Sequence, residues 1–289
     1  MDSERAQRGS HANGARRRSD ERESVSGSPR GEAPRLTIDI NCDMGESFGP
    51  WRIGADTEVM PHITSANIAC GAHAGDPTVM RRTVRLARAA AVRVGAHPGF
   101  ADLQGFGRRE MTVDPAELED SLIAQIGALA AIAQAEGTSL QHVKAHGALY
   151  NMAARQPVLA AAIARAIAAC GRSLIMYALP GSAMIDAGQA AGLRVAAEGF
   201  ADRSYEPDGS LTPRSRPGAV IDDPGAVVDR AVRMVRDGVV LTAGGKEVPL
   251  RVDTICVHGD TPGAPELARR IHEALIAAGA TVAPIGGRL

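Results

Sequence analysis

The sequence has few aromatic residues: one Trp, three Tyr and four Phe, or 3% of 289 residues. A surface that stacks on nucleic-acid bases needs several aromatic rings, so this scarcity argues against such a function. The formal net charge is only −1, and no overall field attracts nucleic acid or an anionic membrane. We therefore expect neither nucleic acid nor a membrane among the partners of this chain.

Paired cysteines and long apolar runs are also missing. The four cysteines, Cys42, Cys70, Cys170 and Cys256, form no CxxC pair, which argues against a zinc ribbon or a thioredoxin-like motif. No apolar run approaches the ~20 residues of a membrane span, and the N-terminus lacks the apolar centre of a signal peptide. These absences predict a soluble, cytoplasmic protein with buried free thiols.

Residues 1–34 differ in composition from the rest of the chain. They are rich in Arg, Ser, Gly, Glu and Asp and have almost no apolar side chains. Such a segment cannot bury enough surface to offset the entropy lost on ordering. We expect a disordered tail over residues 1–34 and a single catalytic domain over residues 35–289, for which a hydrophobic content of 45% is sufficient.

From Leu36 onward, short apolar runs alternate with helical segments. Several helices are expected to begin at Asp-Pro, an N-cap followed by proline at the first helical position. The strands are predicted at residues 36–42, 66–70, 93–96, 142–145, 174–179, 194–197 and 254–257. Helical connections between strands indicate a parallel sheet, and apolar strands indicate burial on both faces. About seven near-equal units, most with polar residues after the strand, favour a closed (β/α) barrel over an open, doubly wound sheet.

Chemically capable side chains follow most of the predicted strands. In a parallel barrel the carboxyl ends of the strands meet at one face, so we expect these side chains to share one pocket. In chain order they are Asp43, Glu46, Asn67, His73, His97, Arg109, Lys144, His146, Tyr150, Glu198, Arg203, His258 and Asp260. Asp39 lies within the first predicted strand and is interpreted as structural, whereas Asp43 and Glu46 lie past its end.

These residues fit two kinds of chemistry. In the first, a divalent metal bound by Asp43, His73 and His97 activates water for hydrolysis. The second is metal-independent or ATP-linked acyl chemistry, with Asp43 or Glu46 as general base.

In the second chemistry, Lys144, His146 and His258 stabilise negative charge on the intermediate. The sequence contains no GxxxxGK[ST] phosphate loop, and Gly244-Gly245-Lys246 is typical of a hairpin turn. A nucleotide would therefore be bound in another way or by a partner.

Six long motifs resemble the LamB/YcsF family, which is assigned as the A subunit of 5-oxoprolinase. The resemblance extends over about residues 36 to 285, in the family's order. The motifs are DINCDMGESFGPW from Asp39, SANIACGAHAGDP from Ser65, GAHPGFADLQGFGRRE from Gly95, VKAHGALYN from Val143, EGFADRSYEPDGSLTPR from Glu198 and VHGD from Val257. One departure is Ala145, where the family usually has proline.

The resemblance implies a barrel of the glycoside hydrolase/deacetylase kind. It also implies ATP-dependent hydrolysis of 5-oxo-L-proline to L-glutamate, with ATP as co-substrate and the B and C subunits of 5-oxoprolinase as partners. We hypothesise catalytic roles for Asp43, Glu46, His73, His97, Lys144 and His146. Substrate binding is hypothesised for Asn67, Arg109, Tyr150, Glu198, Arg203, His258 and Asp260.

Two other functions stay open at this point. The first is a metal-dependent deacetylase or amidohydrolase that acts on a carbohydrate or a small amide. The second is a non-catalytic protein whose pocket binds a ligand for its partner proteins.

Overall fold

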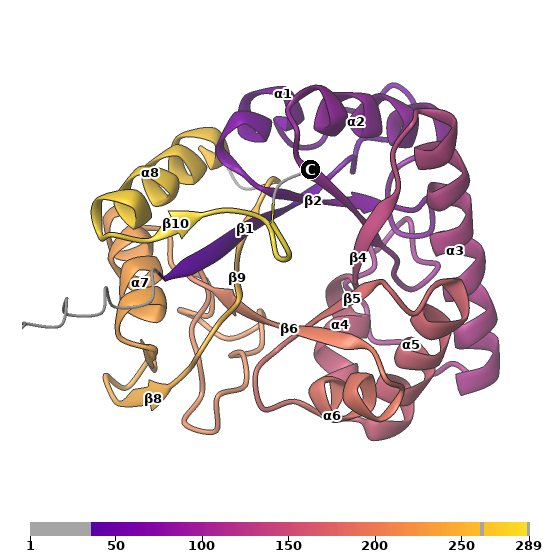
Figure 1. Ribbon diagram of the computed structural model, residues 1–289. Helices are drawn as coiled ribbons and strands as arrows, with labels where there is room; N and C mark the ends of the chain where they lie inside the picture. The colour runs from indigo at the N-terminus through magenta and orange to yellow at the C-terminus, as the bar shows by residue number, and fades with distance from the viewer. Residues whose placement is uncertain (1–35, 261–262, 288–289) are drawn as a thin grey trace, which may run out of the picture. The chain divides into compact units, whose positions relative to one another are not determined.

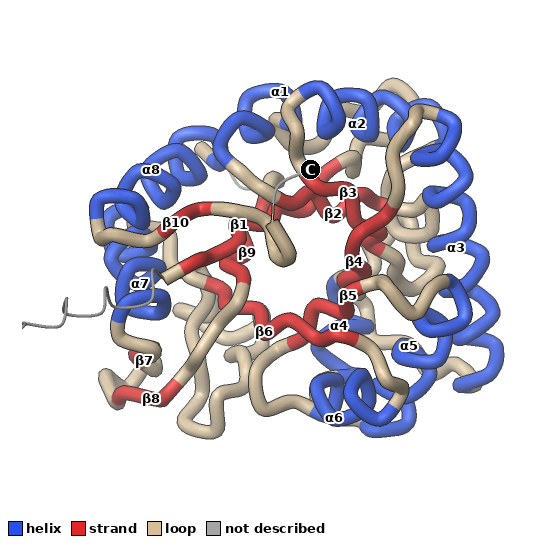
Figure 2. Tube along the Cα trace, viewed as in Figure 1, coloured by secondary structure: helices blue, strands red, loops and turns tan. Residues whose placement is uncertain are grey.

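The computed structural model describes residues 36–260 and 263–287. Seven parallel strands form a barrel in the order β1-β2-β3-β4-β5-β6-β9, and pairing of β1 with β9 closes it (Figures 1 and 2). The strands are β1 (Thr37–Met44), β2 (Ser65–Ala69), β3 (Arg93–His97), β4 (Leu140–Lys144), β5 (Ile175–Ala178), β6 (Arg194–Phe200) and β9 (Thr254–His258). The predicted (β/α) barrel of about seven strands is therefore confirmed. The predicted tail, residues 1–34, lies outside the described residues.

Helices form the outer layer around the barrel (Figure 2). They are α1 (Asp56–Val59), the 3₁₀ turn η1 (Met60–His62), α2 (Pro77–Ala89), α3 (Pro115–Ala135), α4 (Gly147–Ala153), α5 (Pro157–Cys170), α6 (Ala183–Ala190), α7 (Pro224–Arg236) and α8 (Ala264–Ala277). The Asp-Pro starts are confirmed, because the Asp76, Asp114 and Asp223 side chains each accept hydrogen bonds from backbone N–H groups of the first turn. The predicted hairpin is the antiparallel pair β7 (Val239–Leu241) and β8 (Glu247–Pro249).

The structure corrects two local predictions and adds one element. β1 continues to Met44, so Asp43 lies inside the strand rather than past its end. β6 continues to Phe200 and includes Glu198. Helix α4 adds an element without a clear sequence signal, because it has only seven residues and no side chain caps its N-terminus.

The interior of the barrel is polar. This corrects the expectation that the strands carry apolar side chains on both faces. β1 alternates, and its Asp39, Asn41 and Asp43 side chains contact strands across the barrel. The apolar residues between them belong to the main hydrophobic core: Ile38, Ile40, Cys42 and Met44. Asp39 accepts hydrogen bonds from the hydroxyls of Thr64, Ser65, Tyr177 and Thr254. These bonds give Asp39 the structural setting expected for it.

The C-terminal segment covers the amino end of the barrel. The short strand β10 (Thr281–Val282) pairs with the start of β1, and the following loop crosses the barrel opening (Figure 2). Ile285 in this loop packs against Ile175, Tyr177 and Ala196. An apolar plug thus closes the amino end, and the polar interior opens toward the carboxyl ends of the strands.

No single helix in residues 36–260 and 263–287 has the length and apolarity to cross a membrane. Helices α4 and α5 meet that test only when they are taken together across a bend of 117°.

Replacing Gly95 by alanine is expected to destabilise the barrel strongly. A Cβ atom at this position of β3 would lie 2.0 Å from Nε2 of His142 on β4, and both residues are enclosed by the barrel. Overpacking of this kind costs about 3 kcal/mol, which a urea titration would measure as a loss in unfolding free energy. The matched control is Gly127→Ala in α3, where a Cβ meets nothing within 4 Å and should stabilise the helix by up to about 1 kcal/mol. Equal effects of the two substitutions would contradict the packing argument.

Candidate active site

A cavity of about 40 Å³ lies at the carboxyl ends of the strands. Most of the predicted site residues line it, although they come from distant parts of the sequence. They are Asp43, Glu46, His97, Lys144, His146, Tyr150, Arg203, His258 and Asp260. The barrel therefore brings these side chains together, as their positions in the sequence predict.

A buried ion cluster forms the floor of this cavity. Lys144 Nζ donates a hydrogen bond to Asp43 Oδ1 at 2.8 Å and lies 2.9 Å from Glu198 Oε1. Burial opposes the charge of this ammonium, but Asp43 and Glu198 together raise the pKa of Lys144 well above its usual value. Nζ also contacts Cys256 Sγ at 3.0 Å and Asn41 Oδ1 at 3.3 Å. Lys144 is therefore a fixed positive charge at the base of the site.

Asp43 is held as a carboxylate. Its Oδ1 also accepts a hydrogen bond from Asn67 Nδ2 at 2.8 Å, and its Oδ2 lies 3.3 Å from His97 Nε2. Burial alone would raise the pKa of Asp43, but His97 and Lys144 outweigh burial and lower it well below its usual value. A carboxylate stabilised in this way is a weak base and acts mainly as a fixed negative charge.

Glu46 has the opposite electrostatic environment. The turn at Gly45 has φ +67°, a conformation that glycine adopts without strain, and Glu46 follows with its side chain in the cavity wall. Burial, and next the negative charge of Asp43, raise the pKa of Glu46 well above its usual value. Glu46 is thus better suited than Asp43 to hold a proton and to donate it.

Three histidine rings lie close to Glu46. His73 and His146 are stacked, with ring centroids 3.7 Å apart, and their Nε2 and Nδ1 atoms lie 3.8 and 3.9 Å from Glu46 Oε1. The third ring, His97, meets both of them edge to face. Burial lowers the pKa of both His73 and His146 well below the usual value, so both rings favour the neutral form.

His97 and His146 face each other through one nitrogen each. His97 Nδ1 lies 2.8 Å from the Lys144 carbonyl, and His146 Nε2 lies 2.8 Å from the Phe106 carbonyl. Because carbonyls only accept hydrogen bonds, each of these two nitrogens carries a proton. The remaining nitrogens are 2.9 Å apart, and two lone pairs at this distance require a cation between them. A proton on His97 Nε2, next to the Asp43 carboxylate, satisfies this requirement, and a metal ion is the alternative.

Comparison with known proteins identifies the family. The LamB/YcsF family model matches residues 38–289. The chain belongs to the LamB/YcsF family. It is 58% identical over 247 residues to a protein of Chloroflexus aggregans that is named as the A subunit of 5-oxoprolinase, covering 86% of this chain and 98% of the relative. The protein of the same name from Pyrococcus furiosus is 52% identical, covering 87% and 98% of the two chains.

Solved structures agree with this assignment. A crystal structure of the lactam utilization protein from Thermus thermophilus has a TM-score of 0.82 and 48% identity, and the match covers 86% of this chain and 99% of that one. A putative cellobiose-phosphate cleavage protein from Enterococcus faecalis has a TM-score of 0.53 at 15% identity, covering 86% and 97% of the two chains, and shares the fold alone.

Four predicted residues of this LamB/YcsF chain do not line the cavity. Asn67 and Glu198 are fully buried beneath it, in contact with Asp43 and Lys144 respectively. His73 lies behind His146. Arg109 lies outside the cavity, where its side chain is 64% exposed and pairs with the buried carboxylate of Asp102. The neighbouring Arg108 takes the place predicted for Arg109 and forms an ion pair with Asp260 at 2.6 Å.

Sequence reasoning missed further residues of the site. Arg214 and Leu211 reach the cavity from the loop after β6, and Asp202 contacts His258 Nδ1 at 2.6 Å. Asp202 could have been found, because it follows a predicted strand like the other candidates. Arg214 gives no such signal, since it lies in a long irregular segment with several arginines.

The expected metal set is also rearranged. Among the described residues, one group that could hold an ion is Glu46, His73, His97 and His146, whose ligand atoms lie within 4.8 Å of one another. Asp43 belongs to a different group, with Cys256 and His258, and its first oxygen is already engaged by Lys144.

The histidines of the first group differ in how well they suit a metal. The buried His73 ring has no hydrogen-bond partner among the described residues on either nitrogen, which agrees with a ligand role. The stacked, parallel rings of His73 and His146 are less suitable, because both in-plane lone pairs cannot point at one ion without rotation of a ring.

The polar layer below the cavity makes stability depend on pH. His142 Nε2 contacts Asn67 Oδ1 at 2.7 Å, and its ring stacks on Tyr177. Burial, and next the charge of Lys144, lower the pKa of His142 to about 3. The unfolded chain binds a proton at this histidine near pH 6.5, so between pH 6.5 and 3 the unfolded state binds more protons than the folded state.

His142→Gln is therefore expected to reduce the acid sensitivity of folding. The contribution of His142 to stability is fully present above pH 6.5 and is lost as pH falls toward 3. Between pH 7.5 and 5.5 this one group accounts for about 1.4 kcal/mol of lost unfolding free energy. Urea titrations measure the unfolding free energy of both proteins at pH 7.5 and at pH 5.5. On going to the lower pH, the wild type should lose about this much more unfolding free energy than the variant. The same pH slope for both proteins would show that His142 does not stay neutral in the folded state.

Proposed function

We propose that this chain is the A subunit of an ATP-dependent 5-oxoprolinase, which together with the B and C subunits hydrolyses 5-oxo-L-proline to L-glutamate. The observation that carries the proposal is near-full-length identity of 52–58% to proteins that bear this subunit's name. The cavity at the barrel end, which is lined by charged side chains, supports an enzymatic role over a scaffold role.

The chemistry of the substrate explains the need for ATP. A lactam is a stable amide, and its carbon resists attack by water. Phosphorylation of the lactam oxygen by ATP makes that carbon electrophilic. Addition of water and cleavage of the C–N bond then give an acyl phosphate, whose hydrolysis releases glutamate and phosphate. Since the sequence contains no GxxxxGK[ST] loop, the nucleotide is bound in another way or by a partner.

Glu46 is the candidate acid for the ring nitrogen. Cleavage of the C–N bond leaves its electron pair on nitrogen, which must gain a proton. Burial, and next the negative charge of Asp43, raise the pKa of Glu46 well above its usual value, which favours a side chain that holds a proton and can donate it. Lys144 and His97 supply positive charge and hydrogen bonds next to the reacting carbon and stabilise negative charge there.

A metal-dependent deacetylase or amidohydrolase is the second candidate. It is favoured by the group Glu46, His73, His97 and His146 and by the unpartnered nitrogens of His73 among the described residues. Imidazole and carboxylate ligands suit zinc and other first-row divalent ions. In that case Glu46 would be a ligand rather than a proton donor, and activity would need the metal but no ATP.

Glu46→Gln is expected to lower glutamate release at least 100-fold, because glutamine cannot transfer a proton and general acid catalysis contributes about 10² to 10⁴ in rate. The measurement uses this chain reconstituted with the B and C subunits, ATP and 5-oxoproline. Glu58→Gln in α1 is the control, since Glu58 is exposed and does not line the cavity. It should leave the rate within about twofold, as for other surface substitutions.

Chelation distinguishes the two candidate functions in the same assay. Glutamate release that needs ATP and survives chelator supports the 5-oxoprolinase without a metal. The deacetylase would be supported by two results: stoichiometric zinc in the purified chain, and amide hydrolysis that needs no ATP and is abolished by chelator. Together these results would contradict the 5-oxoprolinase function. Near-normal activity of folded Glu46→Gln would remove Glu46 from the mechanism.

A further inference from the structure

Arg214 is the arginine at the cavity that has the weakest local partner. Arg108 forms an ion pair with Asp260 at 2.6 Å, and the buried Arg203 donates hydrogen bonds to two backbone carbonyls. Arg214 instead donates to the neutral ring nitrogen His258 Nε2 at 3.2 Å. Within residues 36–260 and 263–287, no carboxylate lies at ion-pair distance from Arg214. Its charge is therefore available to an anion that enters the site.

The contact with Arg214 fixes the state of His258. A guanidinium only donates hydrogen bonds, so His258 Nε2 must present its lone pair. The ring proton then lies on Nδ1 and is donated to Asp202 Oδ2 at 2.6 Å. An imidazole oriented by a carboxylate in this way is an effective acceptor of protons at its other nitrogen. In the structure that acceptor is covered by Arg214.

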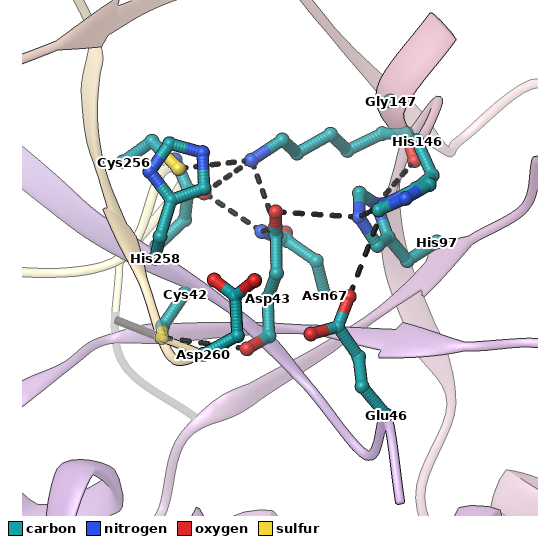
Figure 3. Close-up of polar contacts among 12 residues, drawn as sticks. Cys42, Asp43, Glu46, Asn67, His97, His146, Gly147, Cys256, His258 and Asp260 are labelled. Carbon is teal, nitrogen blue, oxygen red and sulfur yellow. Dashed lines mark hydrogen bonds and ion pairs between the residues drawn. The ribbon is translucent and has the colours of Figure 1, made fainter. Parts of the chain in front are cut away.

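His258 and Glu46 lie on opposite sides of Asp43 (Figure 3). Opening a cyclic amide needs one group that accepts a proton from water and one that gives a proton to nitrogen. Glu46 is suited to give a proton. Asp43 is a weak base because of its lowered pKa. Since His258 presents a carboxylate-oriented lone pair at the cavity wall, it is the best-placed acceptor for the proton of water.

The space around Arg214 shows where an anionic group would lie. The cavity of about 40 Å³ holds about three water-sized atoms by the usual measure of 10–15 Å³ for one water. A neighbouring cleft of about 290 Å³ shares six lining residues with it: Arg108, Gly147, Asn151, Arg203, Leu211 and Arg214. A ligand that extends from the region of Asp43 into this cleft passes Arg214, which lines both.

We propose that Arg214 binds an acidic group of the substrate and, by moving to that group, uncovers His258 Nε2 as the base for the attacking water. This rests on the proposed function, in which the substrate is a small lactam with a carboxylate. A charge-assisted, bidentate hydrogen bond to an anion is about twice as strong as one to a neutral acceptor, so an anion competes successfully with His258. The base is then free only when an acidic substrate is present.

The proton and electron balance of this step is complete. The water oxygen bonds to the activated lactam carbon and gives one proton to His258 Nε2. The C–N bond breaks, and its electron pair goes to nitrogen, which takes protons from Glu46 and from protonated His258. The added hydroxyl becomes a carbonyl by returning its proton to Glu46. Both side chains end in their starting states.

Arg214→Gln tests the binding half of this proposal in the assembly with the B and C subunits. KM for 5-oxoproline should rise about 10- to 100-fold, as expected for loss of a charged hydrogen bond, with a smaller change in kcat. The KM of Arg214→Lys for 5-oxoproline should lie between those of the wild type and Arg214→Gln. The control is Arg216→Gln, two residues away on the same loop, where the arginine pairs with Glu206 at 3.3 Å. Arg214→Gln should also lose the preference for 5-oxoproline over 2-pyrrolidinone, which lacks the carboxylate. An unchanged KM and preference would overturn the proposal.

Histidine NMR tests the exchange of partners without any activity. In the full chain labelled with ¹⁵N-histidine, 5-oxoproline should shift the His258 Nε2 resonance toward its position in Arg214→Gln, and should leave that variant unchanged. Inorganic phosphate is the second probe. It shows whether a phosphoryl group, like a carboxylate, draws Arg214 away from His258 and shifts the Nε2 resonance. A His258 signal that responds to neither anion in the wild type sinks the proposal. If reconstitution shows no 5-oxoprolinase activity while the NMR shifts occur, the proposed function fails and the Arg214 exchange stands.

Discussion

The buried ammonium of Lys144 is the constraint on which the structure of the site depends. A charge that is fully removed from water is costly unless it is paired and hydrogen-bonded. Its partners, Asp43 and Glu198, come from β1 and β6, while Lys144 comes from β4. The cluster therefore exists only when the barrel is closed, and it accounts for polar side chains in a space that many barrels fill with Val, Ile and Leu. The apolar plug at Ile285 isolates this polar column from solvent at the amino end.

The same cluster separates the chemistry of the two nearest carboxylates. Lys144 and His97 hold Asp43 ionised, and the negative charge of Asp43 then adds to burial in raising the pKa of Glu46. The pKa values of two carboxyl groups in one cavity are thereby shifted in opposite directions, the arrangement from which acid and base roles are usually assigned. The difference arises from fixed charges on strands, so it does not depend on a ligand.

The architecture could be predicted from local signals, because each β/α unit carries them within a few residues. Asp-Pro pairs mark helix starts, and short apolar runs mark strands. The polarity of the barrel interior is also present in the sequence, as the alternation in IDINCDM. The apolar residues of that run also fit a strand buried on both faces. Under that interpretation the strand ends before Asp43, whereas in the structure Asp43 lies in the strand and inside the barrel.

The rest of the site depends on loop conformation, which local signals do not determine. Arg108 and Arg109 are adjacent and identical in chemistry, yet the loop after β3 directs one to Asp260 at the cavity and the other to Asp102 outside it. Arg214 lies in an irregular loop and meets His258 only because β6 and β9 are neighbours in the barrel.

These placements suggest a division of labour between strands and loops. Lys144, Asp43 and Glu198 are held on strands by packing and by one another, and a ligand cannot move them without breaking a buried ion pair, a loss of about 3–5 kcal/mol. Arg214 sits on a loop and contacts a neutral acceptor, which is a far weaker restraint. A small anion can therefore change the arrangement of the rim while the charged floor stays fixed, which allows substrate binding to alter proton transfer at His258 without altering the charges that stabilise the reaction.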